Sequence, residues 1–337
     1  MDFDVAIEKF FGQYLVSERN ASSNTIRSYR DTFLLLIEFF KSELNISVEK
    51  ITLEVIDRTL VCTFLDWLEK TKGNSFSTRN QRRAVLCIFF SYLMYLDPEH
   101  ISQWKLITTI RPKKGTKGVI NYLTIDGMRL LLSQIDITNQ KGRRNLTLLS
   151  FLYNTAVRVQ ELIDLTPSNL RLEKPFAVEV MGKGSKKRLV PLDESLVNLL
   201  TKYMSEYGLN DITNHNRPLF FNSRGQKLSR PGIQYLIDKY ADSARILRPD
   251  IIPKVLSPHC FRHSKAMHLI QAKCPLIYIR DLLGHVSIET TEVYARTDSE
   301  HKREALENAY KEVGITPPTL TSWEKDPKLK AFLKSLG

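Results

Sequence analysis

Apolar residues recur at helical spacing through the first third of the chain. Positions three or four residues apart are apolar in four segments, near residues 3–18, 21–43, 51–72 and 77–95. In the second segment the apolar stripe consists of Ile26, Tyr29, Phe33, Leu36, Ile37 and Phe40. None of these segments shows the strict alternation that is typical of a strand. We therefore predict an all-helical domain over residues 1–107, with the stripes as its core.

Beyond about residue 120 the hydrophobic pattern becomes mixed. Helical spacing predicts helices at residues 124–135, 143–154, 159–164, 193–206, 230–245, 257–272 and 275–283. Between them, AVEVMGKGSKKRLVPL (residues 177–192) alternates on both sides of the turn Gly182-Lys183-Gly184-Ser185, which predicts a β-hairpin. The predicted fold class is mainly α with a small antiparallel β-sheet.

Two shorter stretches border this second domain, which we place at residues 121–312. Residues 108–120 contain Pro, Gly and several cations but no acid, which is typical of a basic interdomain linker. An ordinary flexible hinge is the alternative, although it would not need the cations. In the tail, residues 313–337, apolar residues follow the i, i+3, i+4, i+7 spacing of a helix too small to fold alone, at Leu329, Phe332, Leu333 and Leu336.

The charge balance points to a class of partner. Lys and Arg total 49 against 37 acids, a net charge of +12. A polyanionic partner would account for that sign, whereas solubility alone would not require it, and solvated lysines remain the alternative. The four cysteines are scattered, without a CxxC pair, so we expect reduced thiols. No apolar run approaches the length of a membrane span, and we expect a cytoplasmic protein without a membrane partner.

Arginines crowd the start of a predicted helix in the N-terminal domain. Arg79, Arg82 and Arg83 lie in the first turns of the segment 77–95, where the helix dipole disfavours cations unless an anion joins them. A phosphate would supply that anion, but a solvated face explains the pattern equally well. The candidate phosphate contacts of the helices and the linker are Arg27, Arg30, Arg79, Arg82, Arg83, Lys113, Lys114 and Lys117.

The octapeptide SPHCFRHS, residues 257–264, combines the signals of a helix N-terminus with two histidines and an arginine. Its serine and proline suit the N-cap and the first helical position. His259 and Arg262 then share one face beside free backbone N–H groups, which favours a phosphate ester. His259 and His263 could instead bind zinc, but the arginine on the same turn and the missing zincin glutamate disfavour a metal. A further alternative is a core histidine whose hydrogen bonds are satisfied within the fold, and this suits His263 better than His259.

Further motifs occur in the order of a known family. Arg158 lies in NTAVRVQELIDL, and Lys183 lies in the predicted turn of GKGSKKRLVPL. The stretch LLGHVSIETTEVYAR contains His285 and Tyr294. Together with SPHCFRHSKAMHLI, these stretches resemble the tyrosine recombinase (phage integrase) family, whose members include Xer-like, phage and transposon recombinases. The N-terminal stretches SSNTIRSYRDTF and STRNQRRAVLCIFF resemble its core-binding domain. The first motif departs from the family at residues 156 and 157, with Ala for the usual Gly and Val for the common Leu.

The resemblance implies an architecture and a set of roles. Residues 1–107 would be a SAM-like helical bundle that binds DNA, and residues 121–312 an α+β catalytic domain. Tyr294 would attack the scissile phosphate and form a 3′-phosphotyrosine, while Arg158 and Arg262 hold the non-bridging oxygens. His259 and His285 would hydrogen-bond the phosphate, His259 also as a proton acceptor, and Lys183 would protonate the leaving 5′-oxygen. No metal and no cofactor is needed.

The implied function is site-specific recombination of double-stranded DNA through a Holliday junction. The partners would be paired DNA sites and three further copies of the chain in a tetramer at the nucleoid, with the tail docking either on its own domain or on the next protomer. The alternatives are a type IB-like topoisomerase and a catalytically silent DNA-binding regulator. The sequence does not distinguish integration or excision of a mobile element from chromosome-dimer resolution. We also expect Tyr294 on a polar, mobile segment, since few apolar residues surround it in the sequence.

Overall fold

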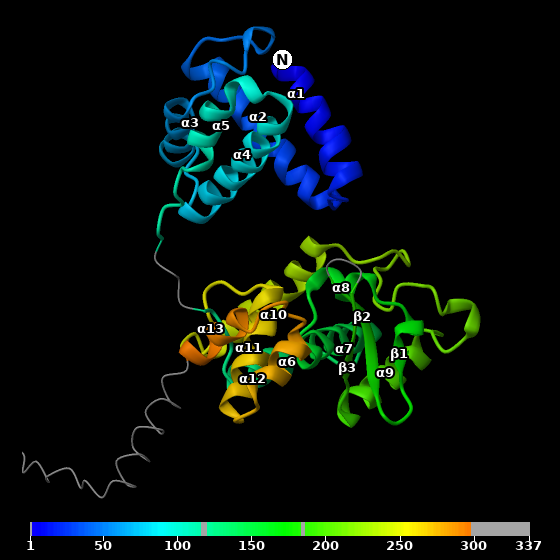
Figure 1. Cartoon of the computed structure of the whole chain (residues 1–337). Helices are drawn as coiled ribbons and strands as arrows, with labels where there is room; N and C mark the ends of the chain where they lie inside the picture. Colours follow the sequence, from blue (N-terminus) through cyan, green and yellow to red (C-terminus); the bar gives the residue numbers. More distant parts are fainter. Residues whose placement is uncertain (1, 116–119, 183–185, 298–337) are drawn as a thin grey trace, which may run out of the picture. The chain divides into compact units, whose positions relative to one another are not determined.

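The computed structural model describes residues 2–115, 120–182 and 186–297, and the chain divides into two compact units, Met1–Gly118 and Val119–Gly337. Both units are mainly helical, and the second also contains a three-stranded antiparallel sheet (Figure 1). The predicted fold class is therefore confirmed. Within the described ranges, no helix is both long enough and apolar enough to cross a membrane.

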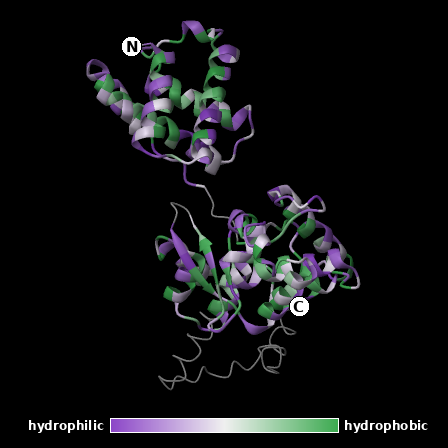
Figure 2. Cartoon of the chain, turned by 90° about the vertical axis from the view of Figure 1, so that its right-hand side faces the viewer, coloured by the Kyte–Doolittle hydropathy of each residue, from purple (hydrophilic) through white to green (hydrophobic). Residues whose placement is uncertain are grey.

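The described part of the first unit consists of helices joined by loops and contains no strand. Its elements are α1 (Phe3–Lys9), which continues as a π-helix (Phe10–Glu18), then α2 (Ser23–Glu43), α3 (Arg58–Lys70), α4 (Phe76–Leu96) and α5 (Ile101–Thr108), with 3₁₀ turns at Val48–Lys50 and Pro98–His100. Hydrophobic and hydrophilic residues alternate along these helices (Figure 2), as expected for amphipathic helices that share a core. Rings meet at the centre of that core, where Phe10 packs on Phe33 and Phe89.

The predicted helix at residues 51–72 is wrong in its first seven residues. The helix begins only at Arg58, because the side chain of Asp57 accepts a hydrogen bond from the backbone N–H of Leu60 (2.7 Å) and caps it. The preceding apolar residues Ile51, Leu53 and Ile56 are buried without being helical. Their spacing reflected burial in the core and not a continuous helix.

The helices predicted for the second unit are all present. They are α6 (Ile125–Ser133), α7 (Gln140–Thr155), α8 (Val159–Asp164), α9 (Glu194–Glu206), α10 (Arg230–Leu247), α11 (Pro258–Gln271) and α12 (Leu276–Leu283), with 3₁₀ turns at Pro167–Asn169 and Ile212–Asn214. A further helix, α13 (Glu289–Thr297), carries Tyr294. The pattern had not predicted α13, because its sequence is mostly polar.

The hairpin is also confirmed, and one more strand joins it. The sheet order is β1 (Leu170–Arg171), β2 (Ala177–Met181) and β3 (Lys187–Pro191), all antiparallel. In the register of β2 and β3, Val178 lies opposite Val190 and Val180 lies opposite Arg188. Val178, Val180 and Val190 are buried in the main core of this unit, so β3 directs residues 188 and 190 toward the interior.

Candidate active site

The first site residue, Arg158, lies in the sharp turn between α7 and α8. Helix α7 ends at Thr155, and its C-cap residue Ala156 has a left-handed backbone (φ 51°, ψ 28°). Arg158 is then the N-cap of α8, and its Nη1 donates to Oε1 of Glu161 at 2.8 Å. Its Nη2 donates to the carbonyl of Gly284 at 3.3 Å, and about a third of the side chain (34%) is exposed. Two hydrogen bonds therefore orient the guanidinium of Arg158, which remains partly exposed.

Arg262 is held more deeply, one turn into α11. It is only 4% exposed, and its Nη1 donates to the carbonyl of Ala156 at 2.7 Å while Nη2 donates to the carbonyl of Leu283. Burial and the neighbouring Arg158 lower its pKa to about 10, so the guanidinium is charged at neutral pH. Backbone carbonyls orient this cation without cancelling its charge.

His285 follows the end of α12. Gly284 terminates that helix in a left-handed conformation (φ 62°), and an added Cβ there would lie 3.0 Å from Cδ of Arg188. The Nδ1 of His285 lies 2.9 Å from Oγ1 of Thr291, and its ring is stacked on that of Tyr294 with 6.4 Å between centroids. Burial and the charges of Arg262 and its neighbours lower the pKa of His285 to about 4, so this ring is neutral at physiological pH.

The structure places the Tyr294 side chain in an apolar pocket, although the segment that carries it is mostly polar, as the sequence indicated. Its side chain is 4% exposed and packs with Ala156, Met267 and Leu283, which come from the segments around three other helices. Burial raises the pKa of Tyr294, and the charge of Arg262 opposes that shift. The apolar surroundings come from distant parts of the chain, so the local sequence around Tyr294 could not reveal them.

His263 is the hydrogen-bond partner of Tyr294 and had not been predicted as a site residue. Its Nδ1 lies 2.8 Å from the hydroxyl of Tyr294. Burial, followed by the charges of His259 and Arg262, lowers its pKa to about 4. His259 lies next to it, with 6.3 Å between ring centroids, and is more exposed. Burial and the charge of Arg262 also lower the pKa of His259. The four-residue spacing of the two histidines was the available signal.

Neither histidine is part of a metal cluster in the described part of the chain. There, no group of three or more His, Cys, Asp or Glu side chains lies close enough together to bind a metal ion. The four-residue spacing of His259 and His263 instead lets both rings face the region of Arg262 and Tyr294.

Arg188 and Glu161 complete the charged network, and only Glu161 had been noted in the sequence, as a supporting or capping group. Arg188 on β3 donates to both carboxylate oxygens of Glu161 (3.0 and 2.8 Å) and, through Nε, to the carbonyl of Leu282 (3.2 Å). Burial alone would raise the pKa of Glu161, but hydrogen bonds from Arg188 and Arg158 lower it overall. Arg158 and Arg188 thus share one carboxylate, and Arg262 beside them donates to backbone carbonyls, which leaves the site with excess positive charge. The sequence signal was an arginine on the buried face of β3.

Two predicted residues and the tail lie outside the described residues. Lys183 belongs to the turn of the hairpin, whose described base is closed by a hydrogen bond from the N–H of Gly182 to the carbonyl of Lys186 (2.8 Å). Lys117 of the linker and the tail at residues 313–337 are likewise not described.

The three arginines of α4 that were predicted to contact phosphate have partners within the first unit. Arg79 is 4% exposed and forms ion pairs with Glu69 and Asp66 of α3. Arg82 donates to the carbonyl of Ser28 (2.8 Å), and Arg83 donates to the carbonyl of Ile110. Carboxylates and carbonyls of the same unit therefore supply the negative partners that the sequence argument had assigned to phosphate.

The other predicted phosphate contacts of the first unit are more accessible. Lys113 bonds with Glu69 (2.8 Å) and Asp66 (3.2 Å), and its side chain is 42% exposed. Arg27, Arg30 and Lys114 are exposed, and Arg30 pairs with its neighbour Asp31. These cations are exposed, whereas Arg79 is buried.

Comparisons with known proteins agree with this geometry. Residues 121–301 match the phage integrase family, and residues 7–95 match the N-terminal SAM-like domain of phage integrases. The Sinorhizobium fredii protein named integrase/recombinase y4rC is 33% identical over 98% of this chain and 97% of its own. Tyrosine recombinase XerD of Listeria monocytogenes is 31% identical over 86% of this chain and 92% of its own.

A solved structure extends the likeness to the fold. The XerH site-specific recombinase, bound to its palindromic difH substrate in a post-cleavage complex, superposes with a TM-score of 0.69 at 25% identity, over 86% of this chain and 80% of its own. Two family models, full-length relatives and a shared fold therefore lead to one conclusion: the chain belongs to the phage integrase family and is a tyrosine-type site-specific DNA recombinase.

Proposed function

We propose that Tyr294 is the nucleophile of this recombinase and that it cleaves double-stranded DNA through a 3′-phosphotyrosine intermediate. The observation that carries the proposal is the position of the Tyr294 hydroxyl, hydrogen-bonded to His263 and next to Arg262 and His285. An isolated surface tyrosine would have no such surroundings. Arg158 belongs to the same cluster, because it donates to the carbonyl of Gly284 and Arg262 donates to the carbonyl of the preceding residue, Leu283.

The phenol requires help to become a nucleophile. Its ordinary pKa is about 10, and burial raises that pKa further. A neutral imidazole can accept the phenolic proton, and His263 is neutral at physiological pH and already in hydrogen-bond contact. We therefore assign proton acceptance to His263, in place of His259. His259 and His285 are left as hydrogen-bond partners of the phosphate.

The cleavage step then balances without a cofactor. The Oη of Tyr294 forms a bond to phosphorus, and the bond from phosphorus to the 5′-oxygen breaks. Arg158 and Arg262 stabilise the negative charge on the non-bridging oxygens of the transition state. In this scheme Lys183 donates a proton to the departing 5′-oxygen, a role that rests on its motif alone. Attack by another 5′-hydroxyl reverses the step and joins the new strand.

DNA and further copies of the chain are the proposed partners. The XerH structure is described as bound to its difH substrate, which supports duplex DNA as the partner here. We propose a tetramer on paired sites, which exchanges strands through a Holliday junction in the cytoplasm, at the nucleoid. In the first unit, Arg27, Arg30, Lys113 and Lys114 are the proposed phosphate contacts, because they are the accessible members of the predicted set.

Replacing the nucleophile tests the proposal directly. Tyr294→Phe should bind a duplex as the unchanged chain does but form no denaturant-resistant adduct with a nicked suicide substrate, since the attacking oxygen is missing. The measurement is gel electrophoresis under denaturing conditions, and adducts that persist in Tyr294→Phe would overturn the assignment. His263→Gln should slow adduct formation more than His259→Gln. Relaxation of any supercoiled plasmid, without paired sites, would instead identify a topoisomerase.

A further inference from the structure

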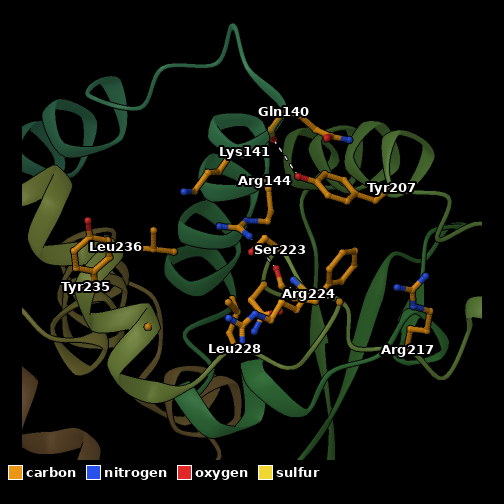
Figure 3. A pocket seen from close by; sticks show the side chains of 14 residues that line it. Gln140, Lys141, Arg144, Tyr207, Arg217, Ser223, Arg224, Leu228, Tyr235 and Leu236 are labelled. Carbon is orange, nitrogen blue, oxygen red and sulfur yellow. Dashed lines mark hydrogen bonds between the residues drawn. The ribbon is translucent and has the colours of Figure 1, made fainter.

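The catalytic unit contains a cationic cavity, of about 760 Å³, that the proposed chemistry does not use. It lies between the first turns of α7 and α10, the C-terminal end of α9 and the segment at residues 217–228 (Figure 3). Four cations line it, Lys141, Arg144, Arg217 and Arg224. None of the described residues that line it is acidic. Such a cavity has the charge of an anion-binding site.

Arg144 is the most informative of these cations. It is 8% exposed, and its guanidinium donates to the side-chain oxygen of Asn145 (3.1 and 2.8 Å) and to the carbonyl of Phe221 (2.9 Å). The amide of Asn145 in turn donates to the hydroxyl of Tyr240 (2.8 Å), which holds the Asn145 oxygen toward Arg144. Among the described residues, no carboxylate forms an ion pair with Arg144.

A buried cation with neutral partners only is unfavourable, and an anion next to it would remove much of that cost. A guanidinium carries five N–H donors, and three donor–acceptor contacts leave some of them free for a ligand. Arg144 also points toward Ser223, another residue that lines the cavity (Figure 3). The burial and the orientation are two separate indications of an anion at this position.

The other three cations line the same cavity as Arg144. Arg217 stacks on the ring of Phe221, with 5.3 Å from Cζ to the ring centroid. Arg224 lies in a turn that is fixed by Asn222, whose side-chain oxygen accepts from the backbone N–H groups of residues 224 and 226 (2.9 and 3.0 Å). Lys141 is exposed on the first turn of α7. Several anionic oxygens of one ligand could therefore be contacted at once.

We propose that this cavity binds phosphate esters. Phosphate suits a set of arginines better than a single carboxylate does, because it offers more acceptor oxygens. The volume exceeds that of one phosphate group and is in the range of small-molecule sites. The ring of Tyr235, 67% exposed, lies at the cavity and is available to stack on a base or sugar. A strand of DNA or a free nucleotide would each supply this chemistry.

The charge of the cavity argues against the tail of the chain as its occupant. Residues 313–337 contain four lysines and two acids, so this segment is itself positive. A DNA strand fits better. Arg144 and Thr155 lie on the same helix, α7, about 16 Å apart at 1.5 Å per residue. A phosphate in the cavity could therefore belong to the duplex that the active site cleaves, and to that extent this inference rests on the proposed function.

A pair of matched variants tests the inference in the full chain. Lys141→Gln/Arg224→Gln removes two exposed cations of the cavity, and Lys202→Gln/Lys254→Gln removes two exposed cations that do not line it. The first probe is a labelled duplex of arbitrary sequence, whose affinity is measured by fluorescence anisotropy over a range of KCl concentrations. Loss of two phosphate contacts should reduce the slope of log K against log [KCl] by about 2. The second probe is ADP, whose binding is measured as a rise in the thermal midpoint of unfolding.

The outcomes separate the sources of the phosphate. A smaller slope in the cavity variant, with the control unchanged, supports DNA phosphate. An unchanged slope, with ADP stabilising the unchanged chain but not the cavity variant, supports a free nucleotide. The inference is overturned if both slopes fall equally or if neither probe distinguishes the variants. Adduct formation by Tyr294 is measured separately, so failure of the cavity proposal does not imply failure of the catalytic one.

Discussion

Arg79 in the first unit and Arg262 in the second are buried to the same extent, each 4% exposed, yet they have different partners. Arg79 forms ion pairs with Glu69 and Asp66. Arg262 donates to the backbone carbonyls of Ala156 and Leu283. Carboxylates cancel the charge of a guanidinium, whereas carbonyl dipoles orient it and leave the net charge in place.

The difference shows what makes a buried arginine suitable for catalysis. Both residues lie in the first turns of a helix, so position on a helix does not distinguish them. In the catalytic unit Glu161 supplies one carboxylate to two guanidinium groups, those of Arg158 and Arg188. In the first unit α3 presents two carboxylates to Arg79 and Lys113. The balance of charge within each cluster decides whether an arginine stabilises the fold or remains available to a phosphate.

The largest expected effect follows from removing the uncompensated charge. Arg262→Gln should slow adduct formation by a factor of about 10²–10³, the usual effect of losing one donor to a transition-state oxyanion. The measurement is single-turnover cleavage of a suicide substrate, normalised to folded protein by circular dichroism. An unchanged rate in folded Arg262→Gln would remove Arg262 from the catalytic set and end the contrast with Arg79.

Arg79→Met should instead act on stability. It removes a buried guanidinium and leaves the half-buried Glu69 with Lys113 as its remaining partner, so we expect the free energy of unfolding to fall by about 2 kcal/mol. Denaturant titration measures this, and the double variant Arg79→Met/Glu69→Leu should recover part of the loss. Cleavage per folded molecule should be unchanged. A stable Arg79→Met with a salt slope of DNA binding reduced by about 1 would show that Arg79 contacts phosphate after all.

The buried histidines of the catalytic unit, His263 and His285, should make its stability depend on pH. The pKa values of His263 and His285 are about 4 in the folded chain, against about 6.5 when unfolded. Between these values the unfolded chain binds more protons, so the free energy of unfolding should fall as pH falls from 6.5 toward 4. We expect the thermal midpoint to fall by about 2–4 °C for each kcal/mol lost.

The double variant His263→Gln/His285→Gln is the control for that pH dependence. Because it lacks both titrating rings, its thermal midpoint should vary less between pH 6.5 and pH 4.5 than that of the unchanged chain. An equal variation in both proteins would assign the acid sensitivity to other groups.

The smallest effect concerns the turn before Arg158. Ala156 has a left-handed backbone (φ 51°), which costs a residue other than glycine about 1–2 kcal/mol. Ala156→Gly removes that strain but also a buried methyl group, which contributes about 0.8 kcal/mol. The net expectation is a gain of about 0.5 kcal/mol in the free energy of unfolding, measured by denaturant titration. A clear loss would show that the methyl group contributes more to packing than the strain costs.

Much of the fold could be predicted from local patterns. The periodicity identified α2, α4, the hairpin and seven helices of the second unit, because each of these elements buries one continuous apolar face. It failed where apolar residues are buried without being helical, as at Ile51–Ile56, and where a polar helix receives its apolar surroundings from elsewhere, as at α13. The motif order named the candidate site, but Arg188 and His263 were missed because their partners are remote in sequence.

The linear chain determined which chemical groups are available and where helices can begin and end, since those properties depend on side-chain type and on spacing within a few residues. Only tertiary packing decided that Arg79 is neutralised, that Arg262 keeps its charge and that Tyr294 is buried against His263. Ion pairing and pKa depend on groups that approach from distant segments and on the water they exclude, and neither can be read from neighbours along the chain.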